Sequence, residues 1–96
     1  MSVAVTKRDL VKNVAKKCSL RQNDVQLVIQ CLLEFIVEKM GEGHRVELRD
    51  FGVFESRRKR ARAARNPRTG DSILVPERNV PHFKPGRLMK DALNNR

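Results

Sequence analysis

Residues 57–75 read RRKRARAARNPRTGDSILV, and this stretch decides the fold. Its first twelve residues, 57–68, carry seven lysines or arginines and no acidic side chain. Only alanines relieve the charge, so this segment has no hydrophobic face to bury and must stay mobile or be ordered by a polyanion. Asn-Pro-Arg-Thr-Gly at 66–70 is a turn signal, and 72–75 resume a strand-like run. The sequence predicts a long, flexible two-stranded ribbon with Pro67 near its tip.

The charge of the chain is concentrated in that ribbon. The 96 residues have a formal net charge of +10, and a chain of this length forms at most one small domain. Outside 57–68 the chain holds 14 basic and 11 acidic residues. Such a local excess favours a polyanion as partner, with nucleic acid as the main candidate. An RNA-binding module or an anionic-membrane module rests on charge alone.

The sequence offers no catalytic constellation. It contains no P-loop, no G-x-S-x-G and no H-E-x-x-H, and its two histidines lie 38 residues apart. We therefore expect no enzymatic activity, no cofactor and no small-molecule substrate. No run of the chain approaches 18 apolar residues, and the N-terminus lacks the apolar stretch of a signal peptide. We expect an intracellular, soluble protein without a membrane partner.

The two cysteines, Cys18 and Cys31, are 13 residues apart within apolar patterns. Neither belongs to a C-x-x-C pair, so we expect buried, reduced thiols. Together with His44 and His82 they lack the ligand spacing of a zinc finger. We therefore predict no metal site.

Two helices are predicted before the ribbon. Thr6-Lys7-Arg8-Asp9 has the form of a capping box, which predicts a helix start, and apolar residues recur at helical spacing from Leu10 to Cys18. The lysines of this helix lie on a solvated face or contact phosphate, and both interpretations stay open. After a break at 19–21, a second helix is predicted from about 22 to 40, ended by Gly41 and Gly43.

The second helix is too apolar to lie on the surface of a small domain. Its polar residues form one narrow stripe at i, i+4 spacing: Gln26, Gln30, Glu34 and Glu38. Nearly every other position is apolar, including Leu32, Phe35 and Ile36. Burial of so much surface needs protein on several sides, so we infer a homodimer core.

The remaining elements are short. Val46 and Leu48 alternate with charged residues, and Asp50-Phe51-Gly52 offers a tight turn into a second strand. Phe51 and Phe54 are expected in the core, as is Phe83 in the strand end at 80–86. A last short helix is predicted from 87 to about 94.

The ribbon can bind nucleic acid by charge and by shape. Seven cations release counterions from phosphates with little base preference, and arginine favours narrow minor grooves. Pro67 is rigid and apolar, so it could wedge between base pairs and kink a duplex, or it could be a plain turn proline. From chemistry alone, both interpretations of Pro67 stay open.

Three blocks of the sequence resemble one family. Asp50-Phe51-Gly52-Val53-Phe54, the tip at 65–70 and Val80-Pro81-His82-Phe83-Lys84-Pro85-Gly86 are similar to the bacterial histone-like DNA-bending proteins, HU and integration host factor. The resemblance covers about residues 6–94. It implies an α+β fold: an intertwined dimer with two N-terminal helices, a three-stranded antiparallel sheet extended into a β-ribbon arm, and a short C-terminal helix.

The resemblance also implies a division of the chain. The helical dimerisation part is expected at about 6–43, the sheet and body at about 45–56 and 76–94, and the arm that embraces DNA at about 57–75. The function it implies is minor-groove binding to duplex DNA with low sequence specificity. Bending by proline intercalation would then organise the bacterial chromosome, with the protein associated with the cytoplasmic nucleoid.

By the same resemblance, Pro67 becomes the intercalating residue. The expected arm contacts are Arg58, Lys59, Arg60, Arg62, Arg65, Asn66, Arg68 and Thr69. The expected body contacts to phosphate are Lys7, Arg57, Arg78, Lys84 and Arg87. The expected dimer core is Leu32, Phe35, Ile36, Phe51, Phe54 and Phe83.

Some features depart from the family pattern. Arg21 stands where the second helix often has a serine cap, so Ser19 with Gln22 caps it instead, or that helix end frays. The arm is unusually rich in arginine. Phe83-Lys84-Pro85-Gly86 looks more like the integration-host-factor branch, which leaves a site-specific heterodimer with a paralogous subunit as the alternative.

Overall fold

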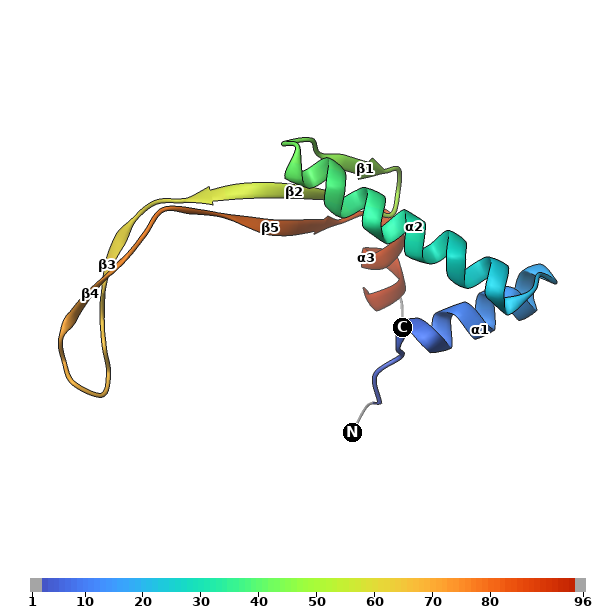
Figure 1. Cartoon of the computed structure of the whole chain (residues 1–96), viewed down its shortest axis with the longest axis horizontal. Helices are drawn as coiled ribbons and strands as arrows, with labels where there is room; N and C mark the ends of the chain where they lie inside the picture. The colour runs from blue at the N-terminus through green and yellow to red at the C-terminus, as the bar shows by residue number, and fades with distance from the viewer. Residues whose placement is uncertain (1–2, 95–96) are drawn as a thin grey trace. The chain divides into compact units, whose positions relative to one another are not determined.

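The structure is a computed structural model that describes residues 3–94 (Figure 1). In chain order its elements are α1 (Lys7–Cys18), α2 (Gln22–Gly41), β1 (Val46–Leu48), β2 (Gly52–Lys59), β3 (Arg62–Arg65), β4 (Ser72–Val75), β5 (Arg78–Pro85) and α3 (Arg87–Asn94). The chain divides into two compact units, Met1–Glu38 and Lys39–Arg96, and each is described by itself. The α+β class expected from the sequence is confirmed.

Helix α1 begins with the predicted capping box. The Thr6 hydroxyl accepts a hydrogen bond from the Asp9 amide at 3.3 Å, and the Asp9 carboxylate accepts one from the Thr6 amide at 3.0 Å. These bonds satisfy amides that a helix start otherwise leaves without partners. The hydrogen bonds from the Thr6 backbone and side chain lower the pKa of Asp9, since they favour its charged form.

Helix α1 ends at Ser19, which corrects the expected role of that residue. Ser19 has a left-handed backbone with φ of +59°, and its amide bonds back to the carbonyls of the last α1 turn. The Leu20 amide donates to the Ala15 carbonyl at 2.9 Å, which completes this end. Ser19 therefore terminates α1 and does not cap α2, which starts at Gln22.

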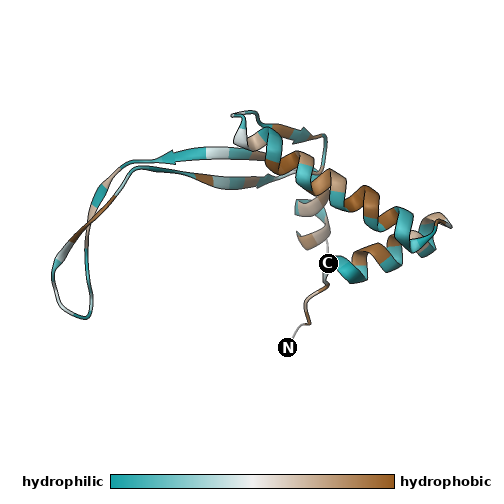
Figure 2. Ribbon diagram, in the orientation of Figure 1, coloured by the Kyte–Doolittle hydropathy of each residue, from teal (hydrophilic) through white to brown (hydrophobic). Residues whose placement is uncertain are grey.

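The core of the first unit is small. Val11 and Ala15 of α1 pack with Val25 of α2, and Ile29 partly covers them. Most aliphatic side chains of α2 stay exposed, with Leu27 at 64 % and Val37 at 70 %. In Figure 2 the hydrophobic residues of α2 are coloured brown along the helix. One chain therefore does not cover the apolar surface of its own second helix.

The expected burial of the two cysteines is wrong for the single chain. Cys18 and Cys31 are both free thiols, and both are exposed. Cys18 is the last residue of α1, where the helix gives way to the turn. Cys31 lies one helical turn from Leu27 and one from Phe35, on surface that the chain leaves uncovered.

The second unit contains the predicted three-stranded antiparallel sheet, in the order β1-β2-β5. Asp50 takes φ of +65° in the turn between β1 and β2, and the Phe51 amide donates to the Leu48 carbonyl at 2.9 Å. Phe83 packs on Phe54 and Phe51, with ring centroids 4.8 and 5.9 Å apart. These phenylalanines hold the hairpin to β5, although Phe51 stays partly exposed.

Helix α3 is tied to the hairpin turn by backbone hydrogen bonds. The Gly86 amide donates to the Phe51 carbonyl at 2.7 Å, and the Leu88 amide donates to the Asp50 carbonyl at 3.0 Å. A Cβ on Gly86 would lie 2.7 Å from the Asp50 carbonyl carbon, so the close approach requires glycine. The end of β5 and the start of α3 are thereby fixed to the base of the sheet.

The arm is a two-stranded ribbon, as predicted, and it consists of two separate ladders. Strands β2 and β5 pair out to Lys59 and Arg78, and β3 and β4 form a separate two-stranded sheet. Residues 60–61 and 76–77 belong to neither, and Figure 1 shows the ribbon bending there. Pro76 explains part of the break, because proline lacks the amide that a ladder needs.

Strand pairing gives the basic segment regular structure although it has no buried side-chain face, because the ladder hydrogen bonds join backbone groups. None of the helices within residues 3–94 is long and apolar enough to cross a membrane.

Candidate nucleic-acid interface

The arm tip is a tight turn from Asn66 to Asp71. The Asn66 amide donates to the Asp71 carbonyl at 2.8 Å, and the Gly70 amide donates to the Asn66 carbonyl at 2.7 Å. Gly70 has φ of +79°, a conformation that glycine adopts without steric cost. Pro67 follows Asn66 and is exposed. The turn thus holds a rigid, apolar ring at the far end of the arm.

Two of the predicted contact residues also shape this turn. The side-chain oxygen of Asn66 accepts a hydrogen bond from the Arg68 amide at 2.9 Å. The Thr69 hydroxyl oxygen accepts one from the Asp71 amide at 3.3 Å. Both side-chain oxygens therefore accept hydrogen bonds within the turn. Asn66 can still donate to a ligand through its side-chain NH₂ group, and Thr69 through its hydroxyl hydrogen.

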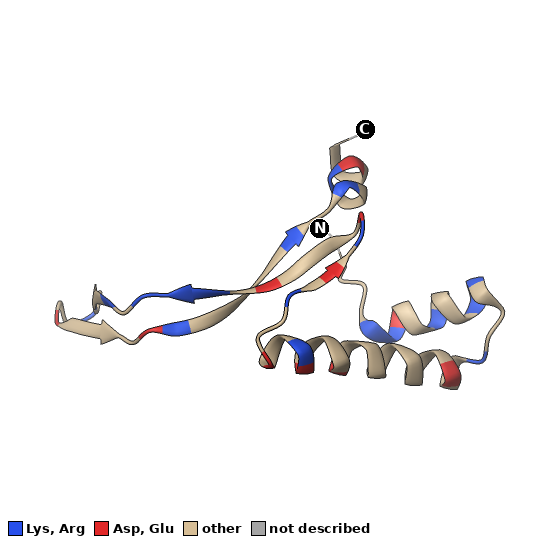
Figure 3. Ribbon diagram, turned by 90° about the horizontal axis from the view of Figure 1, so that it is seen from above, with Lys and Arg blue, Asp and Glu red and all other residues tan. Residues whose placement is uncertain are grey.

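The cations of β2 lie on both faces of the ladder. Successive strand residues point to opposite faces, so Arg57 and Lys59 share one face and Arg58 lies on the other. Lys59 pairs directly with Arg78 of β5. Figure 3 shows the positive charge along the outer part of β2. Strand register cannot be read from the sequence alone, so the meeting of Lys59 with Arg78 was not predicted.

Acidic side chains pair with two of the predicted cations of β2. Arg57 forms an ion pair with Glu55 at 3.6 Å, and Arg58 forms one with Glu77. Within residues 3–94 the structure records no ion pair for Lys59, Arg60, Arg62, Arg65 or Arg68. The basic groups without acidic partners are therefore those nearest the break and the tip.

The break in the arm gathers cations from the two ladders. Lys59 ends β2 and Arg62 begins β3, with Arg60 and Ala61 between them. These four residues line a hollow of about 520 Å³. All four are exposed, so three cations can approach one phosphate-rich surface here.

The body residues predicted to contact phosphate do not form one cluster. Arg78 begins β5, while Lys84 lies near its other end opposite Val53. At about 3.3 Å per residue, these two lie about 20 Å apart. Arg87 begins α3, where its Nε lies 4.0 Å from an Asp50 carboxylate oxygen. The structure thus spreads these cations along the second unit.

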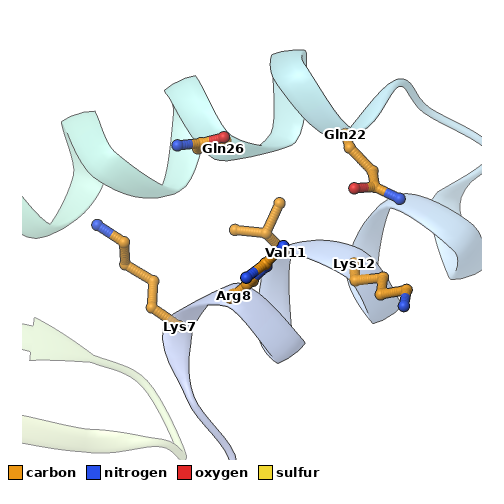
Figure 4. A pocket seen from close by; sticks show the side chains of 6 residues that line it. All are labelled: Lys7, Arg8, Val11, Lys12, Gln22 and Gln26. Carbon is orange, nitrogen blue, oxygen red and sulfur yellow. The ribbon is translucent and has the colours of Figure 1, made fainter.

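Lys7 belongs to the first unit, where it lines a pocket between α1 and α2. The pocket has a volume of about 450 Å³ (Figure 4). Its lining residues are Lys7, Arg8, Val11, Lys12, Gln22 and Gln26. The Lys7 ammonium donates a hydrogen bond to the Gln30 side-chain oxygen of α2. Three cations and two amides make this pocket suited to an anion, whereas the sequence placed only Lys7 of these residues among the body contacts to phosphate.

The predicted dimer-core residues fall into two sets. Leu32, Phe35 and Ile36 lie on α2 in the first unit, where Leu32 and Phe35 are exposed and Ile36 is half-buried. Phe51, Phe54 and Phe83 form the aromatic cluster of the second unit. Within residues 3–94, no group of three His, Cys, Asp or Glu side chains is placed to hold a metal ion.

Comparison with known proteins shows which family the chain resembles in sequence. Residues 5–94 match the family model described as bacterial DNA-binding protein. The chain is 42 % identical over 89 residues to the DNA-binding protein HU of Thermotoga maritima. The matched region covers 93 % of this chain and 99 % of that protein. It is 38 % identical over 92 residues to the integration host factor subunit beta of Marinobacter nauticus, with 95 % and 94 % covered.

A solved structure shares both fold and sequence. HU of Anabaena in a cocrystal with DNA matches with a TM-score of 0.88 and 36 % identity, covering 95 % of this chain and 99 % of that chain. HU from Thermotoga maritima matches with a TM-score of 0.66 and 30 % identity, covering 93 % and 98 %. The chain therefore belongs to the bacterial DNA-binding protein family of HU and integration host factor, whose members are non-enzymatic architectural proteins.

Proposed function

We propose that this protein binds duplex DNA in the minor groove with low sequence specificity and bends it by inserting Pro67 between base pairs. The exposed Pro67 ring at the end of a cationic arm carries the proposal. Partial unstacking of a base step costs a few kcal/mol, which the phosphate contacts of a longer wrapped duplex offset. The cations of the arm and body supply those contacts, and the resulting affinity falls steeply with salt.

The proposal assigns parts of the chain to separate tasks. Residues of about 57–75 form the arm that embraces DNA, with Arg58, Lys59, Arg60, Arg62, Arg65, Asn66, Arg68 and Thr69 as its contacts. Lys7, Arg57, Arg78, Lys84 and Arg87 contact phosphates of the flanking duplex. The cytoplasmic nucleoid is the proposed location.

A homodimer completes the proposed protein. Many aliphatic side chains of α2 are exposed, which exceeds the single scattered apolar residues of an ordinary protein surface. A second copy of the chain is therefore proposed to cover this surface. The helical part at about 6–43 supplies most of this interface, and the phenylalanines of the sheet extend it. Two copies place two arms, each with its own Pro67, on one duplex.

The test compares wild type with Pro67→Ala in a DNA-bending assay, such as fluorescence transfer between the two ends of a duplex. We expect the variant to bind but to bend the duplex much less. Ser72→Ala is the matched control, since it changes an exposed residue close to the same turn but keeps the proline and every proposed contact residue. Equal bending by wild type and Pro67→Ala would falsify intercalation at this residue.

A second candidate is a site-specific subunit that acts with a paralogous partner. The observation in its favour is the 38 % identity to an integration host factor subunit beta, close to the 42 % identity to an HU protein. Competition between a candidate site and random DNA separates the two functions. An affinity ratio near one excludes site-specific binding.

A further inference from the structure

Strand β4 of the arm carries no charge. Ser72–Val75 reads SILV, whereas the partner strand Arg62–Arg65 begins and ends with arginine. Leu74 is 73 % exposed and Ile73 is 46 % exposed. The hydropathy colours of Figure 2 show this as a brown stretch within a mostly teal arm. One strand of the ribbon is therefore cationic and the other aliphatic.

The strand register leaves Leu74 uncovered. Leu74 pairs with Ala63 and Ile73 pairs with Ala64, and a methyl group is too small to cover either side chain. Because side chains alternate, Ile73 shares its face with Ala64 and Val75, which are both half-buried. The other face holds Leu74 with Ala63, Arg65 and Ser72, all exposed. Leu74 is thus the aliphatic side chain that the arm itself does not cover.

The exposed side chain of Leu74 adds nothing to the buried core of the folded chain. Leu74 lies outside the buried cluster, which consists of residues from α1 and α2. An aliphatic side chain exposed on a charged arm gains free energy when a binding partner covers it. Its neighbour on the same face is Arg65, directly before the Asn66–Pro67 tip. The uncovered leucine is therefore continuous with the proposed DNA-binding surface.

The minor groove offers a partner with matching chemistry. Its outer edges are phosphates, and its walls are sugars whose carbon–hydrogen surface is apolar in DNA. In RNA the 2′-hydroxyl of each ribose is displayed in the minor groove. We propose that Leu74 packs against the deoxyribose wall of the groove and so makes the arm select deoxyribose over ribose.

The selection follows from the cost of covering a hydroxyl group. A ribose 2′-hydroxyl pressed against the Leu74 side chain loses water and gains no hydrogen-bond partner. Arg65 on the same face still reaches a phosphate, which both sugars carry, so it does not discriminate. This inference rests on the proposed minor-groove binding and specifies which sugar the groove must contain.

The experiment compares an all-deoxy duplex with the same duplex carrying isolated ribonucleotides along both strands. Isolated substitutions keep the deoxy helix form, so groove shape and sugar chemistry are separated. We expect wild type to prefer the all-deoxy duplex by about fivefold or more, the penalty for one unsatisfied hydroxyl. In Leu74→Ser, whose hydroxyl can pair with the ribose, the preference should fall toward one.

Matched variants keep the result interpretable. Ile73→Ser removes a neighbouring aliphatic residue on the opposite face and should keep most of the preference. Val3→Ser removes an exposed aliphatic residue far from the arm in sequence and should keep all of it. Circular dichroism and thermal unfolding check that each variant folds, which is expected because all three residues are exposed.

The outcomes separate this inference from the proposed function. If wild type binds both duplexes equally, or if Leu74→Ser keeps the wild-type preference, the role of Leu74 is overturned while minor-groove binding stands. If wild type binds the duplexes but Pro67→Ala bends DNA normally, intercalation fails and the sugar preference is still measured. Failure of wild type to bind either duplex overturns both proposals.

Discussion

Lys59 lies directly opposite Arg78 at the outer end of the β2–β5 ladder. Two like charges in directly paired positions destabilise a sheet. A phosphate between them would convert that repulsion into attraction. An anion bound at this pair would therefore stabilise the arm.

The first prediction uses this pair. Lys59→Gln should raise the free energy of unfolding slightly without DNA, because the repulsion is removed, and should weaken DNA binding. The negative slope of log affinity against log salt concentration should become less steep by about 0.9, because one phosphate is no longer neutralised. Thermal unfolding and a salt titration of binding measure the two effects. An unchanged salt slope would show that Lys59 neutralises no phosphate.

The second prediction concerns the capping box. Thr6→Ala should lower the free energy of unfolding by about 1 kcal/mol, because the Asp9 amide loses its acceptor. Urea unfolding at fixed protein concentration measures the loss. Ser72→Ala is the control, since it removes an exposed hydroxyl outside the box. Equal stability of Thr6→Ala and wild type would contradict a stabilising role for the cap.

The third prediction gives the pH dependence of that cap. The pKa of Asp9 is lowered in the folded chain by hydrogen bonds from Thr6. The ionised carboxylate therefore stabilises the fold at pH values above the pKa that Asp9 has in the unfolded chain. This contribution is lost as the pH falls through the lowered pKa of the folded chain. The stability difference between wild type and Asp9→Asn should shrink on acidification. A difference that stays constant with pH would exclude a contribution from this ionisation.

The fourth prediction compares two glycines. Gly86→Ala should destabilise the protein by about 1–3 kcal/mol, because the new Cβ would lie 2.7 Å from a backbone carbon of Asp50. Gly41→Ala meets nothing within 4 Å and should be neutral or stabilising, since Gly41 lies in α2 without a positive φ and alanine has a higher helix propensity than glycine. Thermal unfolding of both variants decides the matter. Equal melting temperatures would contradict the tight packing at Gly86.

The fifth prediction tests the proposed dimer through its thiols. Cys31 lies on the uncovered surface of α2, one turn from Leu27 and one from Phe35, while Cys18 ends α1. A second copy packed on α2 should make Cys31 react with a thiol reagent much more slowly than Cys18 in the native protein. Both should react quickly in denaturant. Equally fast native reaction of the two thiols would count against a dimer at this surface.

The sequence predicted the elements well because their signals are local. The capping box at Thr6, the turn at Asp50 and the proline–glycine turn at the tip each depend on a few neighbouring residues. The excess of apolar surface on the second helix was also readable, since periodicity alone reveals it. The burial of the two cysteines could not be predicted from the sequence, because it depends on which protein surface covers the helices and not on the helices themselves.

The details of the site depended on pairing that a sequence does not show. Strand register decides that Lys59 meets Arg78 and that Leu74 faces a small alanine. The ion pair of Arg58 with Glu77 likewise joins residues 19 positions apart, so a charge count placed Arg58 among the available cations. Pro76 is a local signal for the break between the ladders, and the prediction of a two-stranded ribbon did not include such a break.

The gap between the two ladders determines the mechanics of the arm. Residues 60–61 and 76–77 interrupt both strands at the same level, so a change of angle there breaks no ladder hydrogen bond. We therefore expect the arm to change its angle at residues 60–61 and 76–77 more easily than within either ladder. Such a change would let the arm follow duplexes of different curvature while the tip turn that holds Pro67 keeps its shape.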